Sequence, residues 1–494
     1  MTATKNPLPN ILLILTDQWR ADYLGLLGNG KCATPNLDRL AERSCVFTRA
    51  VTPNPVCQPA RAALLTGRYP HQINLVCQNG DLRPDVRTVL QALQGAGYRT
   101  ASCGKLHYWH ASKPSRDALD AYIEQQKQYG LDDISLLSGR ELKSKKKWCE
   151  YMQLLQDAGL LDKAIEHGLR TVNKGYHRDA PLESRWPGEP WPLPEEYYLD
   201  NVVGRRAVAH LRGFATDRPF YLQTTFSGPH APYNATPSCL DATPYEEVDD
   251  FIAPPDQPLT DAEKKALWRN RHHYKAMILG LDRWVGKLID ILEERGIFDD
   301  TLIVFTSDHG EMLGDHRLYN KQKPYKESSR IPLIVKWPGH DEARRHDGMV
   351  ELTDVSATIL DAAGLEPRAG LDTPGLAFHG RIPGRSVRPI VTGQSDAPVR
   401  DCAFSVGDGC WSMVETPRWK LVRWVEDAIA AEPREELFDL EGDPAEVHNR
   451  VDDPDCREVL LDLREKLLRI YESSPVCQQR RSQTWATTSR TASG

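Results

Sequence analysis

Val56-Cys57-Gln58-Pro59-Ala60-Arg61-Ala62-Ala63-Leu64-Leu65-Thr66-Gly67-Arg68 is the segment on which the interpretation of the whole chain depends. Proline near the start of a helix fixes φ without losing a hydrogen bond, so the segment predicts a helix. Cys57 is then expected at or just before the helix N-terminus, where partial positive charge collects. Arg61 follows about one turn later, roughly on the same face, so both residues can contact one small anion.

Taken alone, Cys57 is most simply explained as a buried, unreactive cysteine ahead of an ordinary helix. The spacing of Cys57, Pro59 and Arg61 favours a functional site only if cation ligands and anion-binding residues occur elsewhere in the chain. The rest of the sequence supplies candidates for both.

Two apolar runs end in polar residues that suit a divalent cation. Residues 11–15 are typical of a strand covered on both faces and are followed by Asp17 and Gln18. Residues 301–306 form a second such run, followed by Asp308 and His309. Open α/β sheets bind ligands at the carboxyl ends of their strands, and carboxylate and amide oxygens are ligands for hard cations. Either pair in isolation is also consistent with an ordinary loop.

Basic side chains follow two further predicted strands. Lys105 and His107 come after the strand expected at residues 98–102, and two such groups at a strand end suit an oxyanion pocket. His230 lies between two nearby prolines after the strand expected at 219–226. A rigidly held histidine suits proton transfer to a leaving group. A surface lysine and structural loop histidines are the plain alternatives.

Composition limits the classes of partner. The chain has 494 residues, with 40% hydrophobic and 27% charged residues, which is enough for one large domain and a smaller one. Its net charge of -7 gives no electrostatic reason to expect nucleic acid or an anionic membrane. The eleven cysteines show no paired spacing, and neither a secretory segment nor a run of transmembrane length is present. These features predict reduced thiols and a cytoplasmic setting; homo-oligomerisation stays open.

The segments in combination resemble the sulfatase family, the formylglycine-dependent type I enzymes of the alkaline phosphatase-like superfamily. Cys-x-Pro-x-Arg followed by Thr-Gly at 57–67 is similar to the family's modification motif, and Gly-Lys-x-His at 104–107 to its lysine–histidine element. Pro-His-x-Pro-Tyr at 229–233 and Ser-Asp-His-Gly-Glu at 307–311 resemble two further family motifs. The resemblance covers residues from about 10 to 107 and from 219 to 443.

The resemblance implies that a formylglycine-generating enzyme oxidises Cys57 to formylglycine, whose hydrated aldehyde is the nucleophile. It also implies a divalent cation, Ca²⁺ with Mg²⁺ or Mn²⁺ as alternatives. The implied metal ligands are Asp17, Gln18, Cys57, Asp308 and His309. The implied catalytic residues are Cys57, Arg61, Lys105, His107, His230, Asp308 and Lys321, with Lys323 as a competitor for the last position.

The activity that the resemblance implies is hydrolysis of small-molecule sulfate monoesters to an alcohol or phenol and inorganic sulfate. A phosphonate monoester or phosphodiester hydrolase with the same nucleophile is the alternative. The pair of Lys105 and His107 favours sulfate esters, because phosphonate monoester hydrolases lack that pair. A non-catalytic binding protein that keeps the fold is a third interpretation. Aryl, choline-like, sugar and steroid sulfates all stay open as substrates.

The expected fold is an α/β/α sandwich of the alkaline phosphatase-like type, with a mostly parallel central sheet. We predict a catalytic domain at residues 1–375, with a helical or irregular insertion at about 110–200. A smaller α+β domain with an antiparallel sheet is expected at 385–473, and a disordered tail at 474–494.

Overall fold

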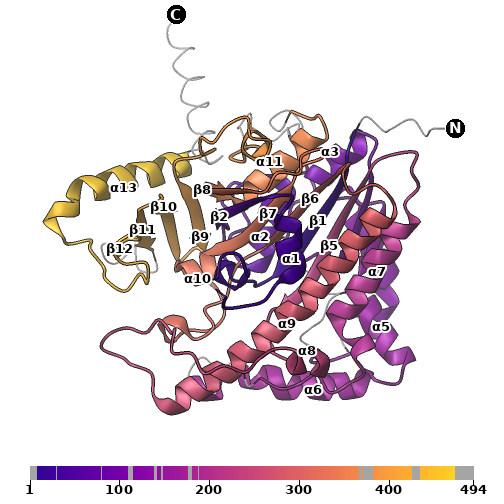
Figure 1. Cartoon of the computed structure of the whole chain (residues 1–494), viewed down its shortest axis with the longest axis horizontal. Coiled ribbons are helices and arrows are strands. Elements are labelled where there is room, and N and C mark those ends of the chain that lie inside the picture. The colour runs from indigo at the N-terminus through magenta and orange to yellow at the C-terminus, as the bar shows by residue number, and fades with distance from the viewer. Residues whose placement is uncertain are drawn as a thin grey trace, which may run out of the picture.

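The computed structural model describes residues 8–472, except 29, 79, 109–114, 138–141, 146–147, 176–180, 187, 367–370, 372–381 and 426–433. The expected tail at 474–494 and most of the expected connection between the two domains lie outside the described residues. Within them the chain forms one eight-stranded and one four-stranded sheet (Figure 1).

The central sheet has the strand order β4-β3-β5-β1-β6-β7-β2-β8. β7 is antiparallel to both of its neighbours, and the other pairs are parallel, which confirms the mostly parallel sheet. The apolar run of β1 is fully buried because β5 and β6 flank it in the middle of the sheet. The strands are β1 Asn10–Asp17, β2 Cys45–Val51, β3 Arg99–Gly104, β4 Asp133–Leu136, β5 Phe220–Pro229, β6 Thr301–Ser307, β7 Arg330–Lys336 and β8 Arg344–Glu351.

Helices cover both faces of this sheet, as expected for an α/β/α sandwich (Figure 1). On one face α9 packs against α1 and α7, and on the other α11 packs against α2 and α3. These helices are α1 Pro35–Ala41, α2 Cys57–Thr66, α3 Val89–Gly95, α7 Leu199–Gly213, α9 Asp261–Glu294 and α11 Leu352–Ala362. The sequence pattern predicts the start of α9 near residue 274. The helix begins earlier because Thr260 and Glu263 form a capping box.

The segment between β3 and α7 is largely helical, as predicted, but it also contributes an edge strand that the sequence pattern does not reveal. β4 has four residues and pairs in parallel with β3. A second strand without a clear signal is β8, whose first half is polar and partly exposed. The helices of the segment are α4 Leu119–Lys127, α5 Glu150–Asp157 and α6 Leu161–Gly175, and the short helices elsewhere are α8 Pro237–Asp241, α10 Lys326–Ser329 and α12 Arg388–Val391.

The C-terminal part forms the antiparallel sheet β12-β11-β10-β9, covered by α13. Its apolar core includes Phe404, Val414, Leu421 and Leu463, and is separate from the main core. The elements are β9 Ala403–Gly407, β10 Trp411–Glu415, β11 Trp419–Trp424, β12 Glu435–Asp439 and α13 Arg457–Glu472. The domain boundaries at 375 and 385 stay a prediction.

A buried ionic cluster joins this sheet to the central one. Arg400 contacts Asp354 and lies 2.9 Å from Glu351, and both carboxylates are fully buried. Glu351 also accepts hydrogen bonds from Tyr69 Oη at 3.0 Å and from the Phe404 N–H at 2.8 Å. The cluster therefore connects residues from both parts of the chain.

We expect Arg400→Met to destabilise the protein by about 3–5 kcal/mol, because the substitution leaves two buried carboxylates without their cation. Urea unfolding followed by circular dichroism would measure the loss. Arg39→Met is the control, since Arg39 is 43% exposed and pairs at 2.7 Å with Asp290, which is 49% exposed. That exposed pair should contribute about 1 kcal/mol or less. Equal losses in the two variants would contradict the prediction.

Candidate active site

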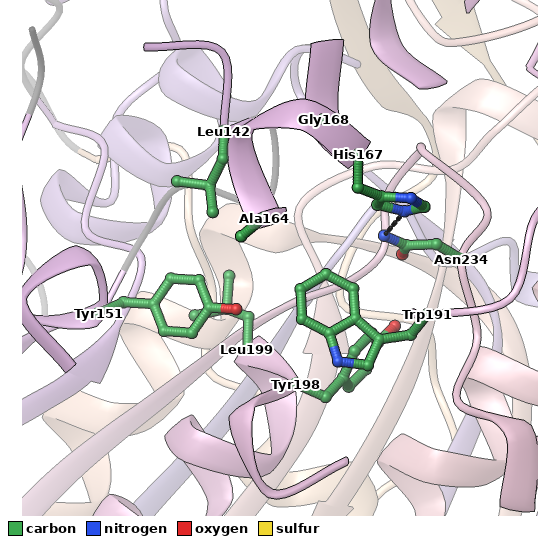
Figure 2. A pocket seen from close by; sticks show the side chains of 9 residues that line it. All are labelled: Leu142, Tyr151, Ala164, His167, Gly168, Trp191, Tyr198, Leu199 and Asn234. Atoms are coloured by element: carbon green, nitrogen blue, oxygen red, sulfur yellow. Dashed lines mark hydrogen bonds between the residues drawn. The ribbon is translucent and has the colours of Figure 1, made fainter. Parts of the chain in front are cut away.

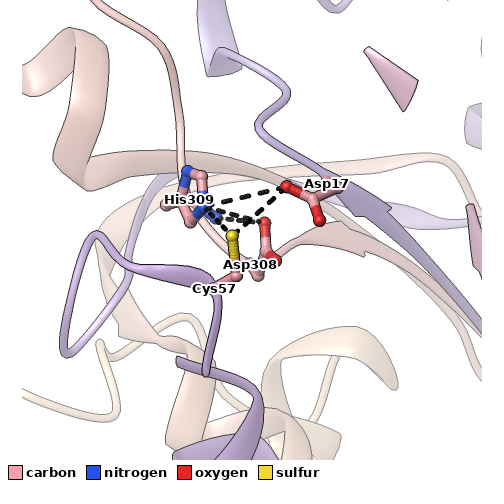
Figure 3. Close-up of side chains that lie close together, drawn as sticks. All are labelled: Asp17, Cys57, Asp308 and His309. Carbon is pink, nitrogen blue, oxygen red and sulfur yellow. Dashed lines mark hydrogen bonds and ion pairs between the residues drawn. The ribbon is translucent and has the colours of Figure 1, made fainter. Parts of the chain in front are cut away.

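The site lies where β1, β6 and α2 meet. β1 and β6 are adjacent and parallel, with Thr16 opposite Ser307, so Asp17 and Asp308 leave the sheet at the same edge. α2 begins at Cys57, as the proline spacing predicts, and ends at Thr66, followed by the C-cap residue Gly67 with φ of 62°. Figure 3 shows that these elements bring Cys57 against both carboxylates and His309.

Four ligand atoms form a compact, fully enclosed cluster. Cys57 Sγ lies 3.5 Å from Asp17 Oδ1 and 3.1 Å from His309 Nε2. His309 Nε2 lies 3.9 Å from Asp17 Oδ1 and 3.6 Å from Asp308 Oδ1. All four ligand atoms are within 4.8 Å of one another. Ligands at right angles around a cation with bonds near 2.4 Å are about 3.4 Å apart, so the cluster fits one divalent ion.

Hydrogen bonds prepare these side chains for a cation. His309 Nδ1 pairs with the Gly310 carbonyl at 2.9 Å, which leaves Nε2 as the nitrogen that faces the cluster. Asp308 Oδ1 accepts the Gln18 N–H at 3.1 Å. Gln18 itself lies beside the cluster, with Oε1 2.9 Å from Lys321 Nζ. The sequence-predicted ligands are therefore together, and their assignment as ligands stays a prediction.

Three cations surround the cluster. Arg61 donates to Asp308 Oδ2 at 2.8 Å and to Asp17 Oδ2 at 3.2 Å, so one guanidinium bridges both carboxylates. Lys105 pairs with Asp17, and Lys321 Nζ lies 3.0 Å from Cys57 Sγ. This contact favours Lys321 over Lys323 as the lysine beside position 57. The arrangement suits a bound anion that carries charge on several oxygens.

These charges set the protonation states. Burial opposes ionisation of Cys57, but Lys105, Lys321 and His309 hold the pKa of its thiol well below the usual value. Burial and the nearby Lys105 lower the pKa of His107 to about 4, so its imidazole is neutral near pH 7. His107 lies close enough to the Cys57 side chain to help lower the pKa of its thiol. A neutral histidine in that position can accept a proton from residue 57.

His230 is the remaining predicted residue, and it lies at the end of β5. Its Nδ1 is 2.6 Å from the Ala231 carbonyl, and it is close enough to Asp17 to help lower the pKa of that carboxyl. Asp200 fixes the end of β5 by accepting the N–H groups of Ser227 at 2.8 Å and Gly228 at 3.1 Å. The structure thus brings all the predicted site residues to one region.

Sequence reasoning gave no role to Glu311, which the structure places beside Gln18. Glu311 is fully buried and accepts a hydrogen bond from Gln18 Nε2. Its position as the last residue of Ser-Asp-His-Gly-Glu is the signal that could have identified it. Gly310 before it is required because a Cβ there would clash with the Glu327 carbonyl.

A separate small pocket lies between the helical insertion and the chain after His230 (Figure 2). His167 and Asn234 meet across it at 3.4 Å. None of its lining residues is a predicted catalytic or metal-binding residue. The lining consists of Leu142, Tyr151, Ala164, His167, Gly168, Trp191, Tyr198, Leu199 and Asn234.

An α/β/α sandwich with a buried acid–histidine–cysteine cluster at its carboxyl edge defines a hydrolase of the alkaline phosphatase-like type. The chain belongs to the sulfatase family, since the family model described as Sulfatase matches residues 9–365. A second model, described as N-sulphoglucosamine sulphohydrolase, C-terminal, matches residues 314–473. The protein is accordingly a sulfuric ester hydrolase.

Similar proteins include sulfatases and a phosphonate monoester hydrolase. An arylsulfatase from Clostridium perfringens is 26% identical over 486 residues, covering 94% of each chain. A choline-sulfatase from Rhizobium meliloti is 28% identical over 482 residues, covering 90% of this chain and 83% of its own. The crystal structure of a phosphonate monoester hydrolase from Agrobacterium radiobacter superposes with a TM-score of 0.73 at 23% identity, covering 94% of this chain and 95% of its own. This last likeness confirms the fold.

Among the helices in the described ranges, none has both the length and the apolar composition needed to cross a membrane.

Proposed function

We propose that the protein hydrolyses sulfate monoesters with formylglycine derived from Cys57, assisted by Ca²⁺ held by Asp17, Gln18, Asp308 and His309. The observation that carries the proposal is the position of Cys57 Sγ, 3.5 Å from Asp17, 3.1 Å from His309 and 3.0 Å from Lys321. Residue 57 therefore contacts two candidate cation ligands and the ammonium group of Lys321.

The cation and the modified residue supply Lewis acidity and an oxygen nucleophile, respectively. The remaining chemistry belongs to side chains of this chain. A sulfate monoester carries one negative charge spread over three oxygens, so Lys105 and Lys321 bind and orient the sulfuryl group. Arg61 holds Asp17 and Asp308 in place. These fixed positive charges stabilise the negative charge that develops while the sulfuryl group is transferred.

Two histidines and a lysine are placed to move protons. His107 is neutral near pH 7 and contacts residue 57, so a ring nitrogen can accept a proton from that residue. His230 or Lys321 protonates the departing alcohol or phenol oxygen. Both residues are only partly buried, and are therefore accessible to a substrate.

The alternative activity is hydrolysis of phosphonate monoesters or phosphodiesters. It is favoured by the likeness to the phosphonate monoester hydrolase fold. It needs the same nucleophile and cation, whereas the presence of Lys105 and His107, which phosphonate monoester hydrolases lack, favours sulfate. The two activities are therefore distinguished by comparing rates on a sulfate ester and on a phosphonate ester.

We expect kcat/KM for p-nitrophenyl sulfate to exceed that for a phenyl phosphonate ester, because the chain has the Lys105 and His107 pair that the resemblance to sulfatases implies and that phosphonate monoester hydrolases lack. Rates should be measured on the full chain coexpressed with a formylglycine-generating enzyme. The opposite order of rates would favour the phosphonate activity.

Intact-mass analysis tests the modification directly, since conversion of Cys57 to formylglycine lowers the mass by about 18 Da. An unmodified, inactive chain after coexpression would favour the non-catalytic binding protein. A cytoplasmic setting stays part of the proposal, based on the cysteine spacing, and the oligomeric state stays open.

A further inference from the structure

Glu311 is a buried carboxylate to which the proposed reaction assigns no role. Its Oε2 accepts a hydrogen bond from Gln18 Nε2. Its Oε1 accepts the backbone N–H groups of Leu313 at 3.0 Å and Asn320 at 2.5 Å. One side chain thus contacts a candidate cation ligand and the loop that carries Lys321.

The amide of Gln18 is held from both ends. An ammonium group has donors only, and Lys321 Nζ donates to Gln18 Oε1 at 2.9 Å. Because Lys321 occupies the amide oxygen, the NH₂ group of Gln18 is the end that faces Glu311 and donates to its Oε2. The backbone of Gln18 is fixed as well, with φ of 70° and its N–H donated to Asp308 Oδ1 at 3.1 Å. The amide oxygen therefore points away from Glu311 and toward Lys321.

We propose that Glu311 is a positioning residue that keeps the amide oxygen of Gln18 directed at the cation, and that anchors the loop carrying Lys321. The inference rests on the proposed function, because it requires a divalent cation beside Gln18. Carboxylates that orient metal ligands without touching the metal commonly contribute 10–100-fold to metal affinity.

Replacement of Glu311 by glutamine should release the amide of Gln18 from its fixed orientation. The new Oε1 can keep the hydrogen bonds from Leu313 and Asn320, which leaves the new NH₂ group facing the NH₂ group of Gln18. Two donors cannot pair, so the hydrogen bond between the two side chains is lost. A reversed Gln18 amide would instead set its NH₂ group against the Lys321 ammonium, which is also a donor, so the amide oxygen is held in neither orientation. We expect Glu311→Gln to weaken Ca²⁺ binding by about 10–100-fold.

Exchange of the two side chains should restore the hydrogen bond. In Gln18→Glu/Glu311→Gln, the amide at 311 donates to the carboxylate at 18, whose second oxygen faces the cation. Gln18→Glu alone places two buried carboxylates in contact and should fail to retain this geometry. We expect the double variant to bind Ca²⁺ at least tenfold more tightly than Glu311→Gln.

The test is calorimetric titration of Ca²⁺, and separately of Mn²⁺, into chelator-treated full-length protein. Glu327→Gln is the matched control, because Glu327 is 3% exposed and its carbonyl accepts the Glu311 N–H, yet its side chain pairs with Lys326 at 3.0 Å. It should keep the wild-type affinity. Thermal midpoints without cation show whether the variants fold.

The outcomes separate this inference from the proposed function. If the wild type binds neither cation, the proposed cation site and this inference are both wrong. If the wild type binds and Glu311→Gln binds equally well, only the role of Glu311 is wrong. Equal losses of Ca²⁺ affinity in Glu311→Gln and in the double variant, with lowered thermal midpoints, would also overturn the positioning role. They would indicate that Glu311 contributes only to the stability of the fold.

Discussion

Cys57→Ser is expected to lower kcat by a factor on the order of 10⁴–10⁶, the range found when a nucleophile is removed from a preorganised site. Serine at this position keeps the contacts of residue 57 with Lys321 and His309 but carries one hydroxyl group. The hydrate of formylglycine has two, and the second allows sulfate to leave without attack of water on sulfur. The serine variant should therefore accept a sulfuryl group once and then stop.

Intact-mass analysis after incubation with p-nitrophenyl sulfate would detect this trapped state as a gain of about 80 Da. Cys57→Ala should show neither the gain in mass nor turnover. Cys402→Ser is the control, since Cys402 is a partly buried cysteine in the C-terminal part, away from the cluster. It should keep wild-type turnover. Full turnover by Cys57→Ser would contradict the formylglycine mechanism.

Local sequence patterns could predict the central part of the fold. The apolar runs at residues 11–15 and 301–306, each followed by a pair of polar residues, predict two strands. Both strands are confirmed as β1 and β6, because such continuous apolar runs suit strands that are buried on both faces. The start of α2 at Cys57 follows from the position of Pro59. No long-range information was needed to predict the strands at residues 10–17 and 301–307 and the candidate ligands at their ends. The only further rule is that the carboxyl ends of parallel strands share one edge of a sheet.

Edge strands and side-chain partners could not be predicted in the same way. β4 has four residues, and the first half of β8 is polar, so neither has a periodic signal; pairing with β3 and β2 makes them strands. The sequence predicts that Arg61 lies beside a bound anion, and it does not reveal that its guanidinium bridges two carboxylates that are 44 and 247 residues away in the chain. The role of Glu311 could not be predicted either, because it depends on contact with Gln18, which is 293 residues away in the chain.

Asp17→Asn is expected to have the second large effect, on both stability and activity. Asp17 is fully buried and pairs with Lys105 and with Arg61 at 3.2 Å. Loss of its charge leaves two cations short of a partner and replaces a charged candidate cation ligand by a neutral one. We expect a loss of about 3–5 kcal/mol in the free energy of unfolding without added cation. For activity, we separately expect a loss of about 4 kcal/mol of transition-state stabilisation, which lowers kcat/KM by a factor on the order of 10³.

The stability loss should depend on pH in a defined direction. Burial and Cys57 would raise the pKa of Asp17, but Lys105, His230 and Arg61 outweigh them and hold it well below the usual value. A lowered pKa in the folded state stabilises the protein above the unfolded value near about pH 4, and this stabilisation is lost as the pH falls further. The difference in thermal midpoint between wild type and Asp17→Asn should therefore be largest above pH 5 and shrink below pH 4.

Thermal unfolding of chelator-treated protein between about pH 3 and pH 7 measures this difference, and Ca²⁺ titration measures the lost ligand. Asp290→Asn is the control, because Asp290 is 49% exposed and pairs with Arg39 at 2.7 Å. It should change stability by about 1 kcal/mol or less and leave kcat/KM unchanged. A constant difference across the pH range would show that Asp17 contributes by packing and not by charge. Retained Ca²⁺ affinity in Asp17→Asn would remove Asp17 from the cation site, since a neutral amide cannot replace the charge that a carboxylate offers a hard cation.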